Sequence, residues 1–110
     1  IQAHKDIVAI YGHNDDMALG ALQVCEDANM QVLACGVDGL MEAVEAIVEG
    51  RYVCTSANDP FKFGQVAVEV AIKLAKGESV EGEVDCGTFL INEENAKQYY
   101  NKDLAFVKGE

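Results

Sequence analysis

Small polar side chains stand at three points where a hydrophobic run of the chain stops. They are His13-Asn14-Asp15, then Asp38, then Asn58-Asp59. A carboxylate accepts hydrogen bonds from two neighbouring hydroxyl groups, whereas a carboxamide both donates and accepts, so the two types together suit a polyol. A charge-assisted hydrogen bond contributes about 1.5–3 kcal/mol net, and two or three of them would hold a small neutral ligand. The residue types therefore point to binding of such a ligand.

Helix capping is the competing interpretation of the same residues, because Asn and Asp are preferred at helix N-caps. The two roles are compatible, since a carboxylate has two oxygens. Asp15, Asp16 and Asp59 are better explained as first-turn or capping residues, where the helix dipole favours negative charge. Asn14, Asp38 and Asn58 are the three ligand candidates.

Three strand-like runs precede the three polar points. They cover residues 7–11, 32–37 and 52–56, and each is followed by a segment with helical periodicity. This alternation predicts an α/β fold with three adjacent parallel strands and helices on both faces of the sheet. Because the carboxyl ends of parallel strands share one edge, the three ligand candidates are expected to face a common space.

The composition and net charge of the chain limit which kinds of molecule it is expected to bind. The chain has 110 residues, the size of a single domain, and a net charge of −11. Such a surface repels the phosphates of nucleic acids and anionic lipids, so neither is expected as a partner. No apolar run approaches the roughly 20 residues of a membrane span, and no motif calls for a cofactor or a metal.

Four cysteines, Cys25, Cys35, Cys54 and Cys86, lack both CxxC pairing and a histidine at zinc-site spacing. Three of them lie in apolar runs, where a free cysteine behaves as a small hydrophobic residue. Buried thiols are the expectation and a disulfide is the alternative, so the cysteines leave the cellular compartment open.

Five segments together resemble the ribose-type periplasmic sugar-binding proteins, the solute receptors of ABC importers. The segments are IYGHNDDMALGA (10–21), CGVDG (35–39), AIVEGR (46–51), TSANDP (55–60) and FLINEEN (89–95). They resemble, in the same order, the family patterns ND(D/E)MAxGA, GxDG, AIxxGx, TxAQxP and xLIxxxN. Each pattern alone is weakly specific, but five in register cover nearly the whole chain.

The resemblance implies one lobe, the C-terminal one, of a type I periplasmic-binding-protein fold, in which sugar lies in a cleft between two α/β lobes. It assigns ligand contact to Asn14, Asp38 and Asn58, although Asn58 replaces the family's longer Gln. It also implies that residues 82–110 hold a hinge strand and a tail crossing to the absent N-terminal lobe. The implied partners are a small sugar or polyol and the membrane subunits of an ABC transporter. The implied location is periplasmic or extracytoplasmic, and a membrane-anchored lipoprotein is one form that such a receptor takes.

Two alternatives and one further expectation accompany this interpretation. The effector-binding lobe of a LacI-type regulator is the alternative function, but the usual Pro before the second strand and the GFDD pattern are missing. An enzyme would need His13 to act with Asp15 or Asp38, yet no nucleophile or metal spacing supports catalysis, so His13 is expected at the rim of the ligand site.

Because one lobe leaves apolar surface exposed, the isolated chain is expected to self-associate, unless its tail folds back on its own lobe.

Overall fold

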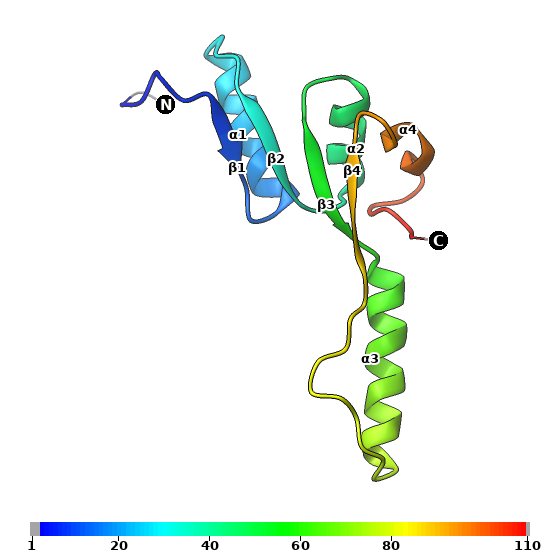
Figure 1. Cartoon of the computed structure of the whole chain (residues 1–110). Coiled ribbons are helices and arrows are strands. Elements are labelled where there is room, and N and C mark those ends of the chain that lie inside the picture. The colour runs from blue at the N-terminus through cyan, green and yellow to red at the C-terminus, as the bar shows by residue number, and fades with distance from the viewer. Residues whose placement is uncertain (1–2, 110) are drawn as a thin grey trace.

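The computed structural model describes residues 3–109, which form a four-stranded sheet in the order β1-β2-β3-β4 (Figure 1). The strands are β1 (Ala9–Tyr11), β2 (Leu33–Asp38), β3 (Cys54–Asn58) and β4 (Thr88–Asn92). Strand β2 pairs in parallel with β1 and β3, whereas β4 runs antiparallel to β3. The predicted α/β class and the three adjacent parallel strands are confirmed.

Three helices pack against one face of the sheet. They are α1 (Asp15–Asp27), α2 (Met41–Val48) and α4 (Ala96–Tyr99). The covered face carries Ala34, Thr55 and Ile91, which are fully buried, whereas Tyr11 and Leu33 on the opposite face are each 64% exposed. The expectation of helices on both faces is therefore wrong for this chain. Two successive right-handed crossovers that step in the same direction along a sheet place both of their helices on the same face.

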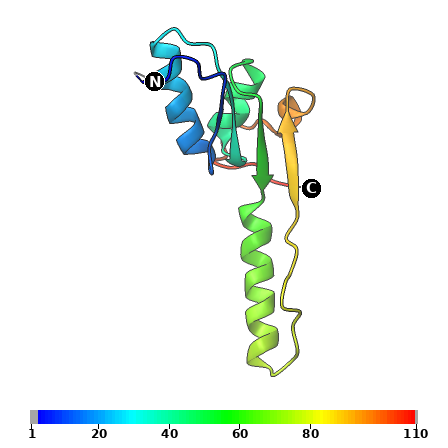
Figure 2. The same ribbon diagram turned by 60° about the vertical axis from the view of Figure 1, so that its left-hand side comes forward.

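Helix α3 (Pro60–Ala75) leaves the sheet instead of packing on it, as both views show (Figures 1 and 2). No residue of this helix is buried, although Phe61, Val68 and Leu74 are apolar. The segment that returns from α3 to β4 runs beside the helix, and the molecule measures 57 × 31 × 20 Å. The helix forms because Asp59 caps it, Pro60 starts it and apolar residues recur at helical spacing, and none of these local signals needs a tertiary partner.

The C-terminal tail lies on its own lobe in this chain, which is one of the two arrangements expected for it when the other lobe is absent. All of β4 pairs with β3, from Asn58 opposite Thr88 to Cys54 opposite Asn92. Beyond α4, Val107 is fully buried and its N–H donates to the Gly39 carbonyl oxygen at 2.9 Å. The antiparallel ladder and this apolar contact hold the tail on the lobe, so the segment that departs is α3.

The four cysteines are all free thiols, and only Cys25 is buried. Cys35 and Cys54 are paired neighbours on β2 and β3 and are partly exposed because no helix covers their face. The expectation of buried cysteines therefore holds for Cys25 alone. Among residues 3–109, no helix has both the length and the apolar character needed to cross a membrane.

Candidate functional site

The three ligand candidates lie at the carboxyl ends of successive parallel strands. Asn14 follows β1 through a two-residue loop, whereas Asp38 and Asn58 are the last residues of β2 and β3. The register pairs Asp38 with Ala57, so Asn58 lies one residue further along the same edge. All three residues are half-buried. The topology therefore brings the three candidates to one edge of the sheet.

Asn14 is the N-cap of α1, as the capping interpretation predicts. Its backbone is extended, and its Oδ1 accepts a hydrogen bond from the Met17 N–H at 2.9 Å. This bond orients the side chain and occupies one lone pair. The carboxamide nitrogen makes no hydrogen bond within residues 3–109, so capping leaves it available to a ligand hydroxyl.

Asp38 and Asn58 differ from Asp59 in the hydrogen bonds that their side chains make. Among the hydrogen bonds of residues 3–109, none involves the Asp38 carboxylate or the Asn58 carboxamide. In contrast, Asp59 uses both oxygens: Oδ1 accepts from the N–H groups of Phe61 (2.9 Å) and Lys62 (3.3 Å), and Oδ2 accepts from Gly109 N–H (2.9 Å). The predicted capping role of Asp59 is confirmed.

Asp15 has a structural role at this edge that its position in the sequence did not indicate. It was expected to be a first-turn acid, but it is fully buried and its carboxylate accepts hydrogen bonds from the Tyr52 hydroxyl at 3.1 Å and the Thr55 hydroxyl at 2.8 Å. Burial raises the pKa of Asp15, and its hydrogen bonds oppose that rise. Burial and the Asp15 charge raise the pKa of Tyr52. The one available signal was a polar Thr55 within an apolar strand, which does not reveal its partner.

His13 is exposed in the loop that follows β1, and its ring lies 5.8 Å from that of Tyr11. No hydrogen bond joins it to Asp15 or Asp38 within the described chain. Among the described residues, no group of three or more His, Cys, Asp or Glu side chains could hold a metal ion.

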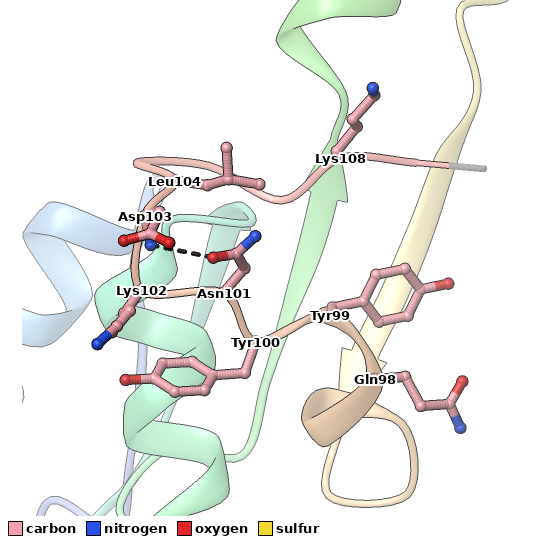
Figure 3. A pocket seen from close by; sticks show the side chains of 8 residues that line it. All are labelled: Gln98, Tyr99, Tyr100, Asn101, Lys102, Asp103, Leu104 and Lys108. Atoms are coloured by element: carbon pink, nitrogen blue, oxygen red, sulfur yellow. Dashed lines mark hydrogen bonds between the residues drawn. The ribbon is translucent and has the colours of Figure 1, made fainter.

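A hollow of about 540 Å³ lies at the C-terminal tail, apart from the three ligand candidates. It is lined by residues 98–104 and Lys108. Figure 3 shows Tyr99 and Tyr100 pointing to opposite sides of the chain, and the dashed hydrogen bond joins Asn101 to Asp103 within the turn. Since its side chains diverge, this hollow offers no convergent set of polar groups.

A family model described as a periplasmic binding protein domain matches residues 1–79. Among curated proteins, the ribose import binding protein of Haemophilus influenzae is 40% identical over 88 residues, which are 80% of this chain and 30% of that protein. The ribose import binding protein of Bacillus subtilis is 36% identical over 81 residues, 74% of this chain and 27% of that protein.

Solved structures agree on the fold. An ABC-transporter solute-binding protein from Mycobacterium smegmatis with bound glycerol has a TM-score of 0.93 and 47% identity, covering 98% of this chain and 38% of that one. A solute-binding protein from Bacillus halodurans with bound myo-inositol has a TM-score of 0.76 and 34% identity, covering 86% and 33%. The chain thus spans about a third of the length of these proteins.

Proposed function

Because this chain belongs to the periplasmic binding protein family, we propose that it supplies one wall of the sugar-binding cleft of an ABC-importer solute receptor. The observation that carries the proposal is the contrast at the edge of the sheet. Asp15 and Asp59 have their oxygens occupied by the protein, whereas Asp38 and Asn58 present unoccupied polar groups beside the free nitrogen of Asn14. An acceptor-only carboxylate between two carboxamides matches the donors and acceptors of adjacent sugar hydroxyls.

The ligands named for related proteins support the same ligand class. Glycerol, D-allose and myo-inositol occupy three structures that are 30–47% identical to this chain, and all three molecules are polyhydroxylated and uncharged. Curated relatives are import-binding proteins for ribose, which favours a solute receptor over a LacI-type regulator. Pentoses, hexoses and inositols present the same kind of hydroxyl group, so the proposed ligand class includes all three.

The remainder of the cleft comes from outside this chain in the proposed receptor. Helix α3 carries apolar side chains that remain largely exposed, including Phe61, which is 65% exposed, and Ile72, which is 49% exposed. We propose that α3, not the tail, packs against the second lobe. Closure of two such lobes would exclude water from the ligand, and the closed receptor would then dock on the membrane subunits of an importer outside the cytoplasm.

A thermal-shift screen of neutral sugars against the full-length receptor that contains this chain tests the ligand class. Asp38→Asn is then compared with the native protein by calorimetry, with Asp16→Asn as the control, because Asp16 is an exposed acid at the same edge. Loss of a charge-assisted hydrogen bond worth about 1.5–3 kcal/mol predicts a ten- to hundredfold higher Kd for Asp38→Asn only. Equal affinities in both variants, or no stabilisation by any pentose, hexose or polyol, would contradict the proposal.

A further inference from the structure

A buried carboxylate joins the first turn of α1 to the turn that follows β2 and to the start of β3. The Oδ2 of Asp15 accepts hydrogen bonds from the backbone N–H groups of Gly39 at 3.0 Å and Leu40 at 2.9 Å. The same oxygen accepts from the Thr55 hydroxyl, while Oδ1 accepts from the Tyr52 hydroxyl. Asp15 therefore contacts the two residues that directly follow Asp38, although none of its four donors lies within 20 residues of it in the sequence.

Asp38 itself has an unusual backbone. Its φ is +115°, and the following Gly39 has a φ of +74°. A non-glycine residue in this region is strained and persists only where the surrounding structure holds it there. The contacts around the turn supply that restraint: the Asp15 carboxylate binds the two N–H groups on one side, and Val107 N–H donates to the Gly39 carbonyl oxygen on the other.

The backbone of this turn sets the direction in which the Asp38 side chain leaves the chain. Its carboxylate makes no hydrogen bond within residues 3–109, so no side-chain hydrogen bond compensates if the turn relaxes. A rotation of the backbone at Asp38 would change the direction of its carboxylate relative to Asn14 and Asn58, the ligand candidates at the ends of the neighbouring strands. The turn that holds the strain thus also aims a proposed ligand group.

We propose that Asp15 is a positioning residue for the sugar site: by binding the N–H groups of Gly39 and Leu40, it holds the strained backbone of Asp38 in its binding orientation. The inference rests on the proposed function for its link to sugar, while its link to the backbone of Asp38 stands on geometry alone. Asp15 itself is fully buried, so its role in the proposal is to hold the turn and not to contact sugar.

The chemistry of the donors explains why a carboxylate is needed here. Four donors converge on two oxygens, and no cation pairs with Asp15, since the ion pairs within residues 3–109 join Arg51 to Glu26 and Glu49. An asparagine would retain the shape, but one of the two acceptor oxygens would become an N–H₂ donor and the other would be neutral, so it would accept weaker hydrogen bonds. Asp15→Asn therefore removes one acceptor and the negative charge while changing the side-chain volume very little.

The first arm of the test uses the 110-residue chain and does not involve sugar. Amide hydrogen exchange is measured at Gly39 and Leu40 in the native chain, in Asp15→Asn and in Asp16→Asn. We expect at least tenfold faster exchange of both amides in Asp15→Asn, relative to amides of β2, and no change in Asp16→Asn. Unchanged protection in Asp15→Asn would overturn the inference.

The second arm measures sugar affinity in the full-length receptor, at a temperature at which each variant is folded by circular dichroism. Val44→Ala is the control for stability, because Val44 is fully buried in α2 and its side chain is neither a ligand candidate nor a hydrogen-bond partner of Asp15. We expect Asp15→Asn to raise the Kd at least tenfold and Val44→Ala to lower the melting temperature with its Kd unchanged. An Asp15→Asn protein with a lowered melting temperature and a native Kd would overturn the positioning role.

Thr55→Val provides a milder variant should Asp15→Asn fail to fold. It removes one donor to Asp15 and one acceptor for Gly39 N–H, so the same two amides are expected to exchange faster and the Kd to rise to a smaller extent. A native Kd and native exchange in Thr55→Val would count against the inference. Absence of sugar binding by the native receptor would contradict the proposed function instead, and the exchange arm would still decide whether Asp15 holds Asp38.

Discussion

Gly36 lies so close to Tyr52 that a Cβ built on the glycine would be 2.5 Å from the tyrosine hydroxyl oxygen. The same Cβ would lie 2.7 Å from Oδ1 of Asp15. Neither group moves freely, because the hydroxyl and the carboxylate are hydrogen-bonded to each other and buried. The absence of a Cβ at Gly36 is thus what leaves room for Asp15 and Tyr52 against β2.

We expect Gly36→Ala to lower the free energy of unfolding by about 1–3 kcal/mol, the usual cost of overpacking a rigid interior. Gly20→Ala is the matched control, since Gly20 is exposed within α1 and has no atom within 4 Å of an added Cβ. That control is expected to stabilise the chain by about 0.5–1 kcal/mol through helix propensity. Urea unfolding monitored by circular dichroism measures the stability of both variants. An unchanged free energy of unfolding in Gly36→Ala would mean that the Tyr52 side chain can move aside without cost.

Gly39 and Gly50 separate steric crowding from backbone strain. Their φ angles are nearly equal, +74° and +77°, but an added Cβ at Gly39 would lie 2.6 Å from Val107 and 2.7 Å from Ala57, whereas one at Gly50 meets nothing within 4 Å. Gly50→Ala should therefore cost only the left-handed backbone penalty of about 1–2 kcal/mol. Gly39→Ala should cost more, because the tail must also move. If chemical unfolding gives equal losses of stability for Gly39→Ala and Gly50→Ala, the tail can move aside without cost.

Tyr52 predicts a specific alkaline instability. Burial first, and then the Asp15 carboxylate, raise the pKa of its phenol above the ordinary value of 10.0. The folded chain then holds the phenolic proton more tightly than the unfolded chain. This contribution to stability is complete below pH 10.0 and is lost as the pH rises above it, with a slope of up to about 1.4 kcal/mol per pH unit.

Tyr52→Phe isolates this effect from the lysines that titrate in the same range. We expect the variant to be less stable at pH 8 by about 1.5–3 kcal/mol, since it leaves Asp15 without one donor to a charged group. The difference between native and variant stabilities should shrink as the pH rises from 10 to 11.5. Urea unfolding at each pH measures it, and a pH-independent difference would mean that Tyr52 ionises as freely in the folded chain as in the unfolded chain.

The exposed position of helix α3 changes which surface is expected to mediate self-association of the isolated chain. Because the tail is folded back on its own lobe, we expect copies to associate through the exposed side chains of α3, among them Val68 (59% exposed) and Ile72 (49% exposed). The net charge of −11 opposes association, so added salt should strengthen it by screening that repulsion.

Sedimentation velocity tests this surface with Val68→Ser/Ile72→Ser. The double variant should be more monomeric than the native chain at every salt concentration. Val24→Ser is the control, because Val24 is 54% exposed on α1 and away from α3. A native chain that remains monomeric at high concentration and high salt would contradict the prediction. Equal reductions of association in the control and the double variant would also contradict it.

Local patterns in the sequence determined the order of elements and the parallel arrangement of the first three strands. Periodicity decides which segments are helices and which are strands, and a helical crossover between strands leaves the next strand parallel. The N-caps Asn14 and Asp59 were also predictable, because a cap bonds only to residues two or three positions away. The convergence of Asn14, Asp38 and Asn58 on one edge followed from the same topology.

Only the tertiary structure decided how neighbouring acids divide their roles. Asp15 and Asp16 occupy the same helical turn with the same side chain, yet one is fully buried and the other is exposed. The partners of Asp15 are 24–40 residues away, so no local periodicity distinguishes it from a first-turn acid. The departure of α3 and the positive φ of Asp38 have the same origin, since both depend on what packs around a segment and not on its own sequence.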